Sequence, residues 1–158
     1  MADTADMAAT AERRPVPPHA LPIGHMREEE VDALVSLWER AGLTRPWNDP
    51  RADIALARRG PHSTILVARD GEKVVGSVMV GHDGHRGWIY YLAVDPALTR
   101  QGLGRALAHT AEDWLKARGV PKLMLLVRPE NEQVRAFYAA SGFIEEPRII
   151  FTKRLDGK

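Results

Sequence analysis

The sequence predicts a mixed α/β fold, in which one mostly antiparallel sheet carries helices on both faces. Between residues 63 and 94, three runs rich in β-branched residues are separated by two short turns, a pattern typical of antiparallel strands. Residues 88–127 then read as a strand, a long helix and a second strand, a unit whose two strands are expected to be parallel. With 158 residues, the chain is long enough for one domain.

Two helices are predicted before the first long strand. Residues 28–41 carry one apolar stripe at helical spacing, and Gly42 ends it. Asp49 followed by Pro50 is typical of a helix start, and this second helix is expected to run to about residue 59. The stripe of the first helix consists of Val31, Leu34, Val35 and Trp38.

Strands are predicted at 63–69, 74–80 and 88–94, with a short edge strand at 21–26. Asp70-Gly71 is a hairpin signal between the first two long strands, and residues 82–87 form a looser turn before the third.

In the second half of the chain, apolar stripes at helical spacing predict a helix over 102–118 and another over 131–140. Between them, residues 123–127 form a continuous apolar run, as expected for a strand that is buried on both faces. Residues 143–155 are expected to supply one or two closing strands.

Composition excludes several classes of protein. The chain has no cysteine, so it has no disulfide scaffold and no thiolate chemistry. The net charge of +1 predicts no overall attraction to nucleic acid or membrane, and no apolar run has the length of a spanning helix. Residues 1–22 are rich in proline and alanine and predict a flexible leader before a single domain at 23–158. The prolines after Arg13-Arg14 argue against an export signal, so a cytoplasmic location is expected.

The glycine-rich turn at residues 99–106 is the main candidate for chemistry. Glycines in the first turn of a helix let a ligand approach the free backbone N–H groups, which favour an anion. Arg100 and Arg105 have the wrong sign for a helix N-terminus unless a phosphate lies there.

Three kinds of phosphate site are compatible in principle with a glycine-rich turn of this sort. A P-loop is excluded, because its Lys-Ser/Thr pair is absent from this turn. A dinucleotide site lacks its third glycine, although Arg128 would suit the 2′-phosphate of NADP. A cradle for the pyrophosphate of coenzyme A is the third.

Four segments together resemble the GNAT family of N-acetyltransferases. They are YYLAVDP (90–96), TRQGLGRAL (99–107), KLMLLV (122–127) and NEQVRAFYAASGF (131–143), in that family's order and spacing. The resemblance covers about 23–155 and is closest to the small bacterial YpeA-like branch, through residues 37–50 and 81–87. Thr99 departs from the usual Gln or Arg at the start of the loop.

The resemblance implies a binding site for acetyl-CoA. In this family the strands here at 88–94 and 122–127 splay apart, and the pantetheine arm pairs with the backbone between them. Asn131 would hydrogen-bond the pantetheine, and Tyr138 would also contact the cofactor and protonate the departing thiolate as the catalytic acid. The other implied cofactor contacts are Leu92, Ala93, Val94, Arg100, Gln101, Gly102, Leu103, Gly104 and Arg105.

The base that would accept a proton from the attacking amine is left open. No acid stands in residues 88–94, where many members of the family carry a glutamate. The candidates are Glu39, Asp49, Asp53, His82, Asp83 and His85. His82, Asp83 and His85 lack a further strong ligand, so no metal site is predicted. Trp47, Asn48, Asp49 and Trp88 are candidates for the acceptor pocket, whereas Trp38 and Trp114 are assigned to the core.

The expected function is transfer of the acetyl group from acetyl-CoA to a primary amine by direct attack in a ternary complex. The acceptor would be a small molecule or a peptide, with no membrane or nucleic-acid partner, and a homodimer is compatible with the fold. A non-catalytic acyl-CoA sensor is the main alternative. An acyl-toxin acting on charged transfer RNA and an NADP-binding module are weaker ones.

Overall fold

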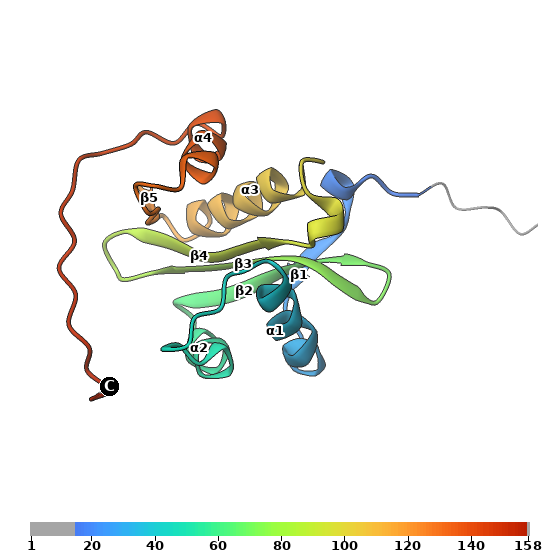
Figure 1. The fold of residues 1–158 in the computed structure, drawn as a ribbon, viewed down its shortest axis with the longest axis horizontal. Helices are drawn as coiled ribbons and strands as arrows, with labels where there is room; N and C mark the ends of the chain where they lie inside the picture. Colours follow the sequence, from blue (N-terminus) through green and yellow to red (C-terminus); the bar gives the residue numbers. More distant parts are fainter. Residues whose placement is uncertain (1–14, 158) are drawn as a thin grey trace, which may run out of the picture.

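The computed structural model describes residues 15–157 and contains one five-stranded sheet (Figure 1). The five strands lie in the sheet in chain order. The first three neighbouring pairs are antiparallel, whereas the last pair, formed by the fourth and fifth strands, is parallel. The strands are β1 (Ile23–His25), β2 (Ser63–Asp70), β3 (Lys73–His82), β4 (Gly87–Val94) and β5 (Leu123–Met124).

Helices cover both faces of the sheet, so the predicted fold class is confirmed. Figure 1 shows helices both below and above the sheet. The lower pair is α1 (Val31–Arg40) and α2 (Pro50–Ala57), and the upper pair is α3 (Leu103–Lys116) and α4 (Glu132–Ala140). Short 3-10 helices occur at η1 (Pro18–Ala20), η2 (Glu28–Glu30) and η3 (Pro96–Leu98). No helix within residues 15–157 is long and apolar enough to cross a bilayer.

The alternation of side chains along the strands creates a separate core on each face of the sheet. Under α3, the predicted apolar stripe packs with one set of strand residues, including Val78 and Ile89. Under α1 and α2, Trp38 and Leu34 are fully buried with the opposite set, including Ile65 and Val67. The stripe of α3 consists of Leu103, Leu107, Ala111, Trp114 and Leu115.

The helix and turn signals are confirmed at their predicted positions. The Asp49 carboxylate accepts hydrogen bonds from the backbone N–H groups of Arg51 at 2.9 Å and Ala52 at 3.3 Å, which caps α2. Gly71 has a φ of +60°, and Asp70 pairs with Lys73 across the hairpin.

The two parallel strands diverge, as the resemblance implied. β4 pairs with β5 only at Gly87–Leu123 and Trp88–Met124, although β4 continues to Val94. A side chain at Gly87 would lie 2.5 Å from Leu115 of α3, so this glycine lets the helix approach the paired end. Along the rest of β4, the edge that faces β5 has no strand partner within residues 15–157.

Two predictions about the second half of the chain are wrong. Residues 143–157 contain no strand, and Figure 1 shows them leaving α4 as an extended segment that passes one end of the sheet. The apolar run at 123–127 is not buried on both faces, since Leu126 is 51% exposed. Both errors have one physical cause: a strand needs a neighbouring edge, and the closing segment does not lie on β5 in this structure.

Of the predicted leader, residues 1–14 lie outside the described residues. Residues 18–22 are part of the packed domain, because Leu21 is only 7% exposed and joins the core under α3.

Candidate active site

The glycine-rich turn forms a concave stretch of backbone at the start of α3. Arg100 has a φ of +61° and Gly102 a φ of +83°, so two left-handed residues alternate with ordinary ones. Successive N–H groups in such a turn point toward a common centre and bind anions. The positive end of α3 follows directly, with Gly102 at its N-cap and no side chain capping it. The loop is therefore suited to a phosphate group.

Asp95 fixes the chain between β4 and this loop. Its buried carboxylate accepts a hydrogen bond from the N–H of Ala97 at 3.0 Å and pairs with Arg40 at 3.1 Å and Lys73 at 3.4 Å. The Ala97 hydrogen bond, together with Lys73 and Arg40, holds the pKa of Asp95 below its usual value. The group therefore stays ionised and anchors η3 to the sheet.

The loop, the end of β4 and α4 meet at Gly104. A Cβ at this glycine would lie 3.4 Å from the Phe137 ring of α4 and 3.6 Å from Val94 of β4. Leu103 is 1% exposed and belongs to the core, so only its backbone is available to a ligand. The side chains of Arg100, Gln101 and Arg105 are exposed around the same loop.

Tyr138 lies in an aromatic cluster beside this junction. Its ring is 5.1 Å from that of Phe137 and 5.2 Å from that of Phe143, both edge-on. It packs, with Leu92 and Val94, against the core under α3. Burial alone raises the pKa of Tyr138 to about 12. The hydroxyl is therefore protonated at neutral pH, as a proton donor must be.

Asn131 is the N-cap of α4. Its side-chain oxygen accepts a hydrogen bond from the N–H of Val134 at 3.3 Å, which leaves the amide nitrogen as the donor toward a ligand. Of the strand residues implied in cofactor binding, Ala93 is buried, and Leu92 and Val94 are half-buried. Their inner edge pairs with β3, through Gly76–Val94 and Ser77–Ala93, and their outer edge faces the gap.

A bulge in β4 precedes these residues, and sequence reasoning missed the groups that hold it. The pairing of β3 and β4 shifts between Ser77 and Met79, and Tyr91 has a φ of +49°. The buried Ser77 hydroxyl donates to the Tyr91 carbonyl at 3.0 Å and accepts from the Trp38 indole at 2.9 Å. The Trp38 and Tyr91 rings stack with their centres 3.8 Å apart. A serine within an otherwise apolar strand was the available signal.

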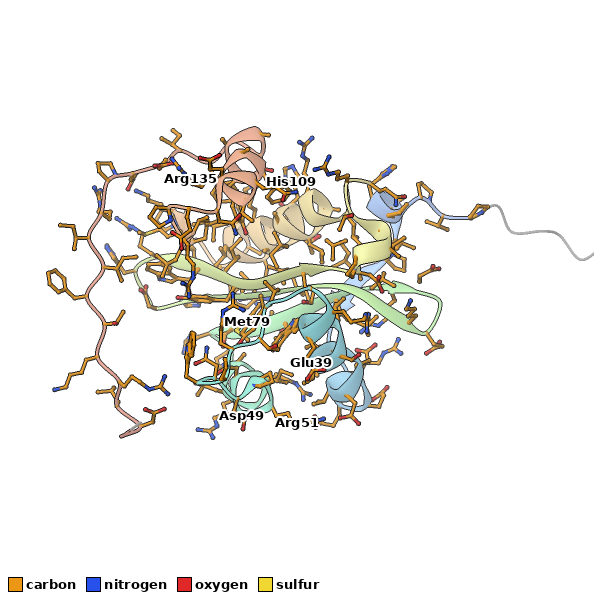
Figure 2. The ribbon with its side chains drawn as sticks, in the orientation of Figure 1. Glu39, Asp49, Arg51, Met79, His109 and Arg135 are labelled. Atoms are coloured by element: carbon orange, nitrogen blue, oxygen red, sulfur yellow. The ribbon has the colours of Figure 1, made fainter. Side chains whose placement is uncertain are left out.

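A cavity of about 610 Å³ opens on the α2 side of the sheet, next to the bulge. Figure 2 shows Met79, one of its lining residues, between the sheet and α2. The lining consists of Leu43, Asn48, Asp53, Leu56, Ala57, His62, Ser63, Met79, Val80, Gly81, His82, Asp83, Trp88, Tyr90 and Tyr91.

The charge of this cavity is negative. Asp53 and Asp83 are its ionisable acids, and its lining residues include no lysine or arginine. Asp83 accepts hydrogen bonds from the N–H groups of Arg86 and His85 and from the Trp88 indole, which together lower its pKa to about 2. Tyr91 donates its hydroxyl proton to Asp53 at 2.6 Å, and burial is the largest cause of its raised pKa. A cationic group suits this cavity.

The cavity separates the candidate bases into two groups. Asp53, His82 and Asp83 line it, whereas Glu39, Asp49 and His85 do not. Because its pKa is about 2, Asp83 is a poor proton acceptor at neutral pH. Of the residues predicted for the acceptor pocket, Asn48 and Trp88 line it, and Trp47 and Asp49 do not.

The His82–His85 turn is organised by its own hydrogen bonds. His82 accepts from the N–H of Gly84 at 3.3 Å, and Asp83 is held as described above. Within residues 15–157, no group of three or more histidine or acidic side chains is arranged to hold a metal ion.

The pKa values of Tyr90, Tyr91 and Tyr138 are all raised, with burial the largest cause in each, and they predict an alkaline loss of stability. These tyrosines keep their protons in the folded chain at a pH where the unfolded chain loses them. The unfolded state then binds fewer protons, so the free energy of unfolding falls as the pH rises from about 10 to about 12. Urea unfolding across this range measures the slope, and the Tyr138→Phe variant should show a shallower one. Equal slopes in the two proteins would contradict the assignment for Tyr138.

Comparison with known proteins identifies the family to which the chain belongs. Residues 25–143 match the acetyltransferase (GNAT) family. An acetyltransferase of Pectobacterium atrosepticum is 42% identical over 129 residues, which are 82% of this chain and 92% of that protein. The ribosomal-protein-S18-alanine N-acetyltransferase of Escherichia coli has a similar structure, with a TM-score of 0.69, 28% identity and coverage of 80% and 79% of the two chains.

Other solved structures share the fold at lower identity. The aminoglycoside N-acetyltransferase AAC(6′)-Iy, in complex with a bisubstrate analogue of CoA, has a TM-score of 0.73 and 18% identity, with coverage of 85% of this chain and 97% of that one. Three observations indicate the same family. They are the splayed strands, the loop before α3 and the family match over most of the domain. The chain belongs to the GNAT family and is an acyltransferase enzyme.

Proposed function

We propose that the protein transfers the acetyl group of acetyl-CoA to a primary amine by direct attack in a ternary complex. The observation that carries this proposal is the arrangement around β4. Tyr90 and Tyr91 line the acidic cavity, and the next residues along the strand, 92–94, border the gap between β4 and β5. An amine in the cavity and a thioester in the gap would therefore meet at the bulge.

The cofactor would occupy the gap and the loop before α3. The loop at 100–105 would bind the pyrophosphate through its backbone, with the exposed arginines adding charge. The pantetheine would pair with the free edge of residues 92–94 and accept a hydrogen bond from the amide nitrogen of Asn131. Acetyl-CoA is here a substrate, and the proposed reaction requires no metal.

The reaction forms a C–N bond and breaks a C–S bond. The amine nitrogen attacks the thioester carbonyl, and an N–H group in the 92–94 stretch would stabilise the negative charge on the carbonyl oxygen. Tyr138 would give its proton to the departing thiolate, which becomes CoA. Asp53, which accepts a hydrogen bond from Tyr91 at the bulge and lines the cavity, would hold the ammonium form and accept its proton through water.

The acceptor is proposed to be a cationic amine, because the cavity carries two acids and no cationic lysine or arginine. The similar structures include enzymes named for aminoglycosides and for the alanine of ribosomal protein S18, so both small polyamines and peptide N-termini belong in a screen. We also propose membership of the YpeA-like bacterial branch and a cytoplasmic location.

The test measures release of free CoA from acetyl-CoA in the presence of amines. The panel contains a polyamine, an aminoglycoside, a peptide with an N-terminal alanine and a neutral alcohol as control. Release that depends on a cationic amine supports the proposal. If acetyl-CoA raises the melting temperature but no amine on the panel releases CoA, the chain is better described as an acyl-CoA sensor. If acetyl-CoA causes no shift at all, the cofactor assignment is wrong.

A substitution in the glycine-rich loop should weaken acetyl-CoA binding. Alanine at Gly102 forces a left-handed φ of +83° on an L residue, and its Cβ would lie 3.0 Å from that of His19. The strain amounts to about 1–2 kcal/mol and is expected to distort the anion-binding turn, which raises the Kd for acetyl-CoA about tenfold. Titration calorimetry measures this change.

Gly119 supplies a matched control for Gly102. It has a φ of +72° at the other end of α3, and a Cβ there would meet nothing within 4 Å. Gly119→Ala should therefore cost similar stability but leave the Kd for acetyl-CoA unchanged. An equal loss of affinity in both variants would show that the loop has no special role.

A further inference from the structure

The acidic cavity has two ends, which the register of β3 and β4 identifies. Met79 lies opposite Tyr90 near the bulge. Two residues further along the strands, Gly81 lies opposite Trp88, close to the turn that joins them. All four residues line the cavity. Because a strand rises about 3.3 Å per residue, this part of the cavity floor extends about 7 Å away from the bulge.

Helix α2 forms the opposite wall and follows the same course. Asp53 accepts a hydrogen bond from the hydroxyl of Tyr91 at 2.6 Å, so this part of α2 lies at the bulge. The Ala57 carbonyl accepts from the hydroxyl of Ser63 at 2.7 Å, and Ser63 pairs with Gly81. The last turn of α2 therefore lies at the outer end of the cavity, and the cavity is enclosed between α2 and the sheet.

The walls between the two ends are apolar and partly open to solvent. Leu56 lies one helical turn after Asp53, on the same side of α2, and is 62% exposed. Tyr90, on the sheet, is 47% exposed. Met79 and Trp88 are half-buried in the same stretch. Large apolar side chains that remain exposed around a cavity mark a surface that a ligand covers.

The two acids of the cavity are not equally available to a cation. Through one oxygen, Asp83 accepts two backbone N–H groups of its own turn, at 2.7 and 2.9 Å. Through the other oxygen, it accepts the indole N–H of Trp88 at 3.1 Å, which fixes that ring. Within residues 15–157, the one side-chain hydrogen bond that Asp53 accepts comes from Tyr91. Asp53 is therefore the acid that remains for one ammonium group, at the bulge.

We propose that the acceptor carries a single ammonium group joined by a short linker to an aromatic ring. Its nitrogen lies beside Asp53 at the bulge. Its ring lies between Leu56 on one side and the rings of Tyr90 and Trp88 on the other. Aromatic rings pack favourably edge-on or offset against one another. This inference rests on the proposed function, because it takes the cavity to be the site from which the amine attacks.

Two kinds of acceptor share this chemistry. One is a small arylalkylamine such as phenethylamine. The other is a peptide that begins with phenylalanine, in which the same number of bonds separates the nitrogen from the ring. Free phenylalanine is disfavoured, because its carboxylate would lie near Asp53 in a cavity whose lining includes no lysine or arginine. Polyamines are disfavoured because their further ammonium groups would lose water against an apolar wall without gaining a free acid.

The first test compares kcat/KM for a set of amines at saturating acetyl-CoA. The set contains phenethylamine, phenylalanyl-glycinamide, free phenylalanine, ethylamine and spermidine. Burial of the ring should raise kcat/KM for phenethylamine or for the peptide about 10- to 100-fold above that for ethylamine. The better of these two substrates identifies the source of the acceptor. Spermidine or free phenylalanine as the best substrate would overturn the inference.

The second test changes the apolar walls. Leu56→Ser and Trp88→Leu should each lower the ratio of kcat/KM for phenethylamine to kcat/KM for ethylamine, by about threefold to tenfold. Because Leu56 is largely exposed, its substitution is expected to leave the fold intact. Val16→Ser is the matched control, since Val16 is 53% exposed and does not line the cavity, so its ratio should match that of the wild-type enzyme. An unchanged ratio in both wall variants would overturn the inference.

A binding measurement distinguishes failure of this inference from failure of the proposed function. Phenethylamine and ethylamine are titrated by calorimetry into the protein saturated with CoA, which carries no acetyl group and so permits no transfer. Tighter binding of phenethylamine, without CoA release from acetyl-CoA by any amine, would support the ligand class and overturn the transfer reaction. CoA release by amines with no preference for an aromatic ring would overturn the ligand class and leave the proposed function standing.

Discussion

Replacing Tyr138 by phenylalanine should lower kcat by about 100-fold or more. The change removes the hydroxyl that is proposed to protonate the leaving thiolate and leaves the ring in its contacts with Phe137 and Phe143. Steady-state kinetics at a pH where chemistry limits the rate measures kcat, and calorimetry should find the Kd for acetyl-CoA nearly unchanged. An unchanged kcat would contradict the role as acid.

A change of acyl donor distinguishes proton donation from a structural role of Tyr138. An acetyl thioester whose thiol is more acidic needs less protonation as it departs. The ratio of the wild-type kcat to the variant kcat should therefore be smaller with such a donor. If this ratio of kcat values is the same with both donors, the hydroxyl contributes to packing or positioning and does not supply the proton.

Replacing Trp38 by alanine should cost about 3–5 kcal/mol of stability and also lower kcat. Trp38 is fully buried, so its removal leaves a large cavity under α1. It also removes the ring stacked on Tyr91 and the donor to Ser77, which together hold the bulge of β4. Urea unfolding measures the stability, and kinetics at a temperature where the variant is folded measures kcat.

Two further variants separate packing from control of the bulge. Trp114→Ala removes a tryptophan of the other core and should destabilise the fold without touching the bulge. Trp38→Phe keeps an aromatic ring near Tyr91 but leaves the Ser77 hydroxyl without its donor, at a cost of about 1–3 kcal/mol. If Trp114→Ala lowers kcat as much as Trp38→Ala does, the bulge is not the feature that matters.

Most of the elements could be predicted because their signals are local. Asp49-Pro50 and the glycines that follow α1 and α3 act within one turn of chain, and the hairpin at Asp70-Gly71 is set by adjacent residues. The apolar stripes of α1 and α3 likewise face the sheet as their periodicity requires. The glycine-rich loop indicated an anion site for the same reason, since its chemistry lies in consecutive residues.

The candidate site was only partly predictable. Tyr138, Asn131 and the 92–94 stretch came from the family resemblance, and the structure brings the end of β4, the loop and α4 together at Gly104. The choice among the acceptor-side residues required the cavity, because Asp53 and Tyr91 are 38 residues apart and are neighbours only in three dimensions. Trp38 and Ser77 are 39 residues apart in the chain, and no short motif relates them.

By itself, the sequence determined the order of helices and strands as far as α4, the fold class and the position of the glycine-rich loop. These depend on contacts within a few residues, where caps, turns and side-chain period act directly. Only the tertiary structure decided where β4 bulges, which acids line the cavity, and that residues 143–157 leave β5 uncovered. Those features depend on which distant segments become neighbours, and the free energy of such contacts is shared among residues that the sequence does not place together.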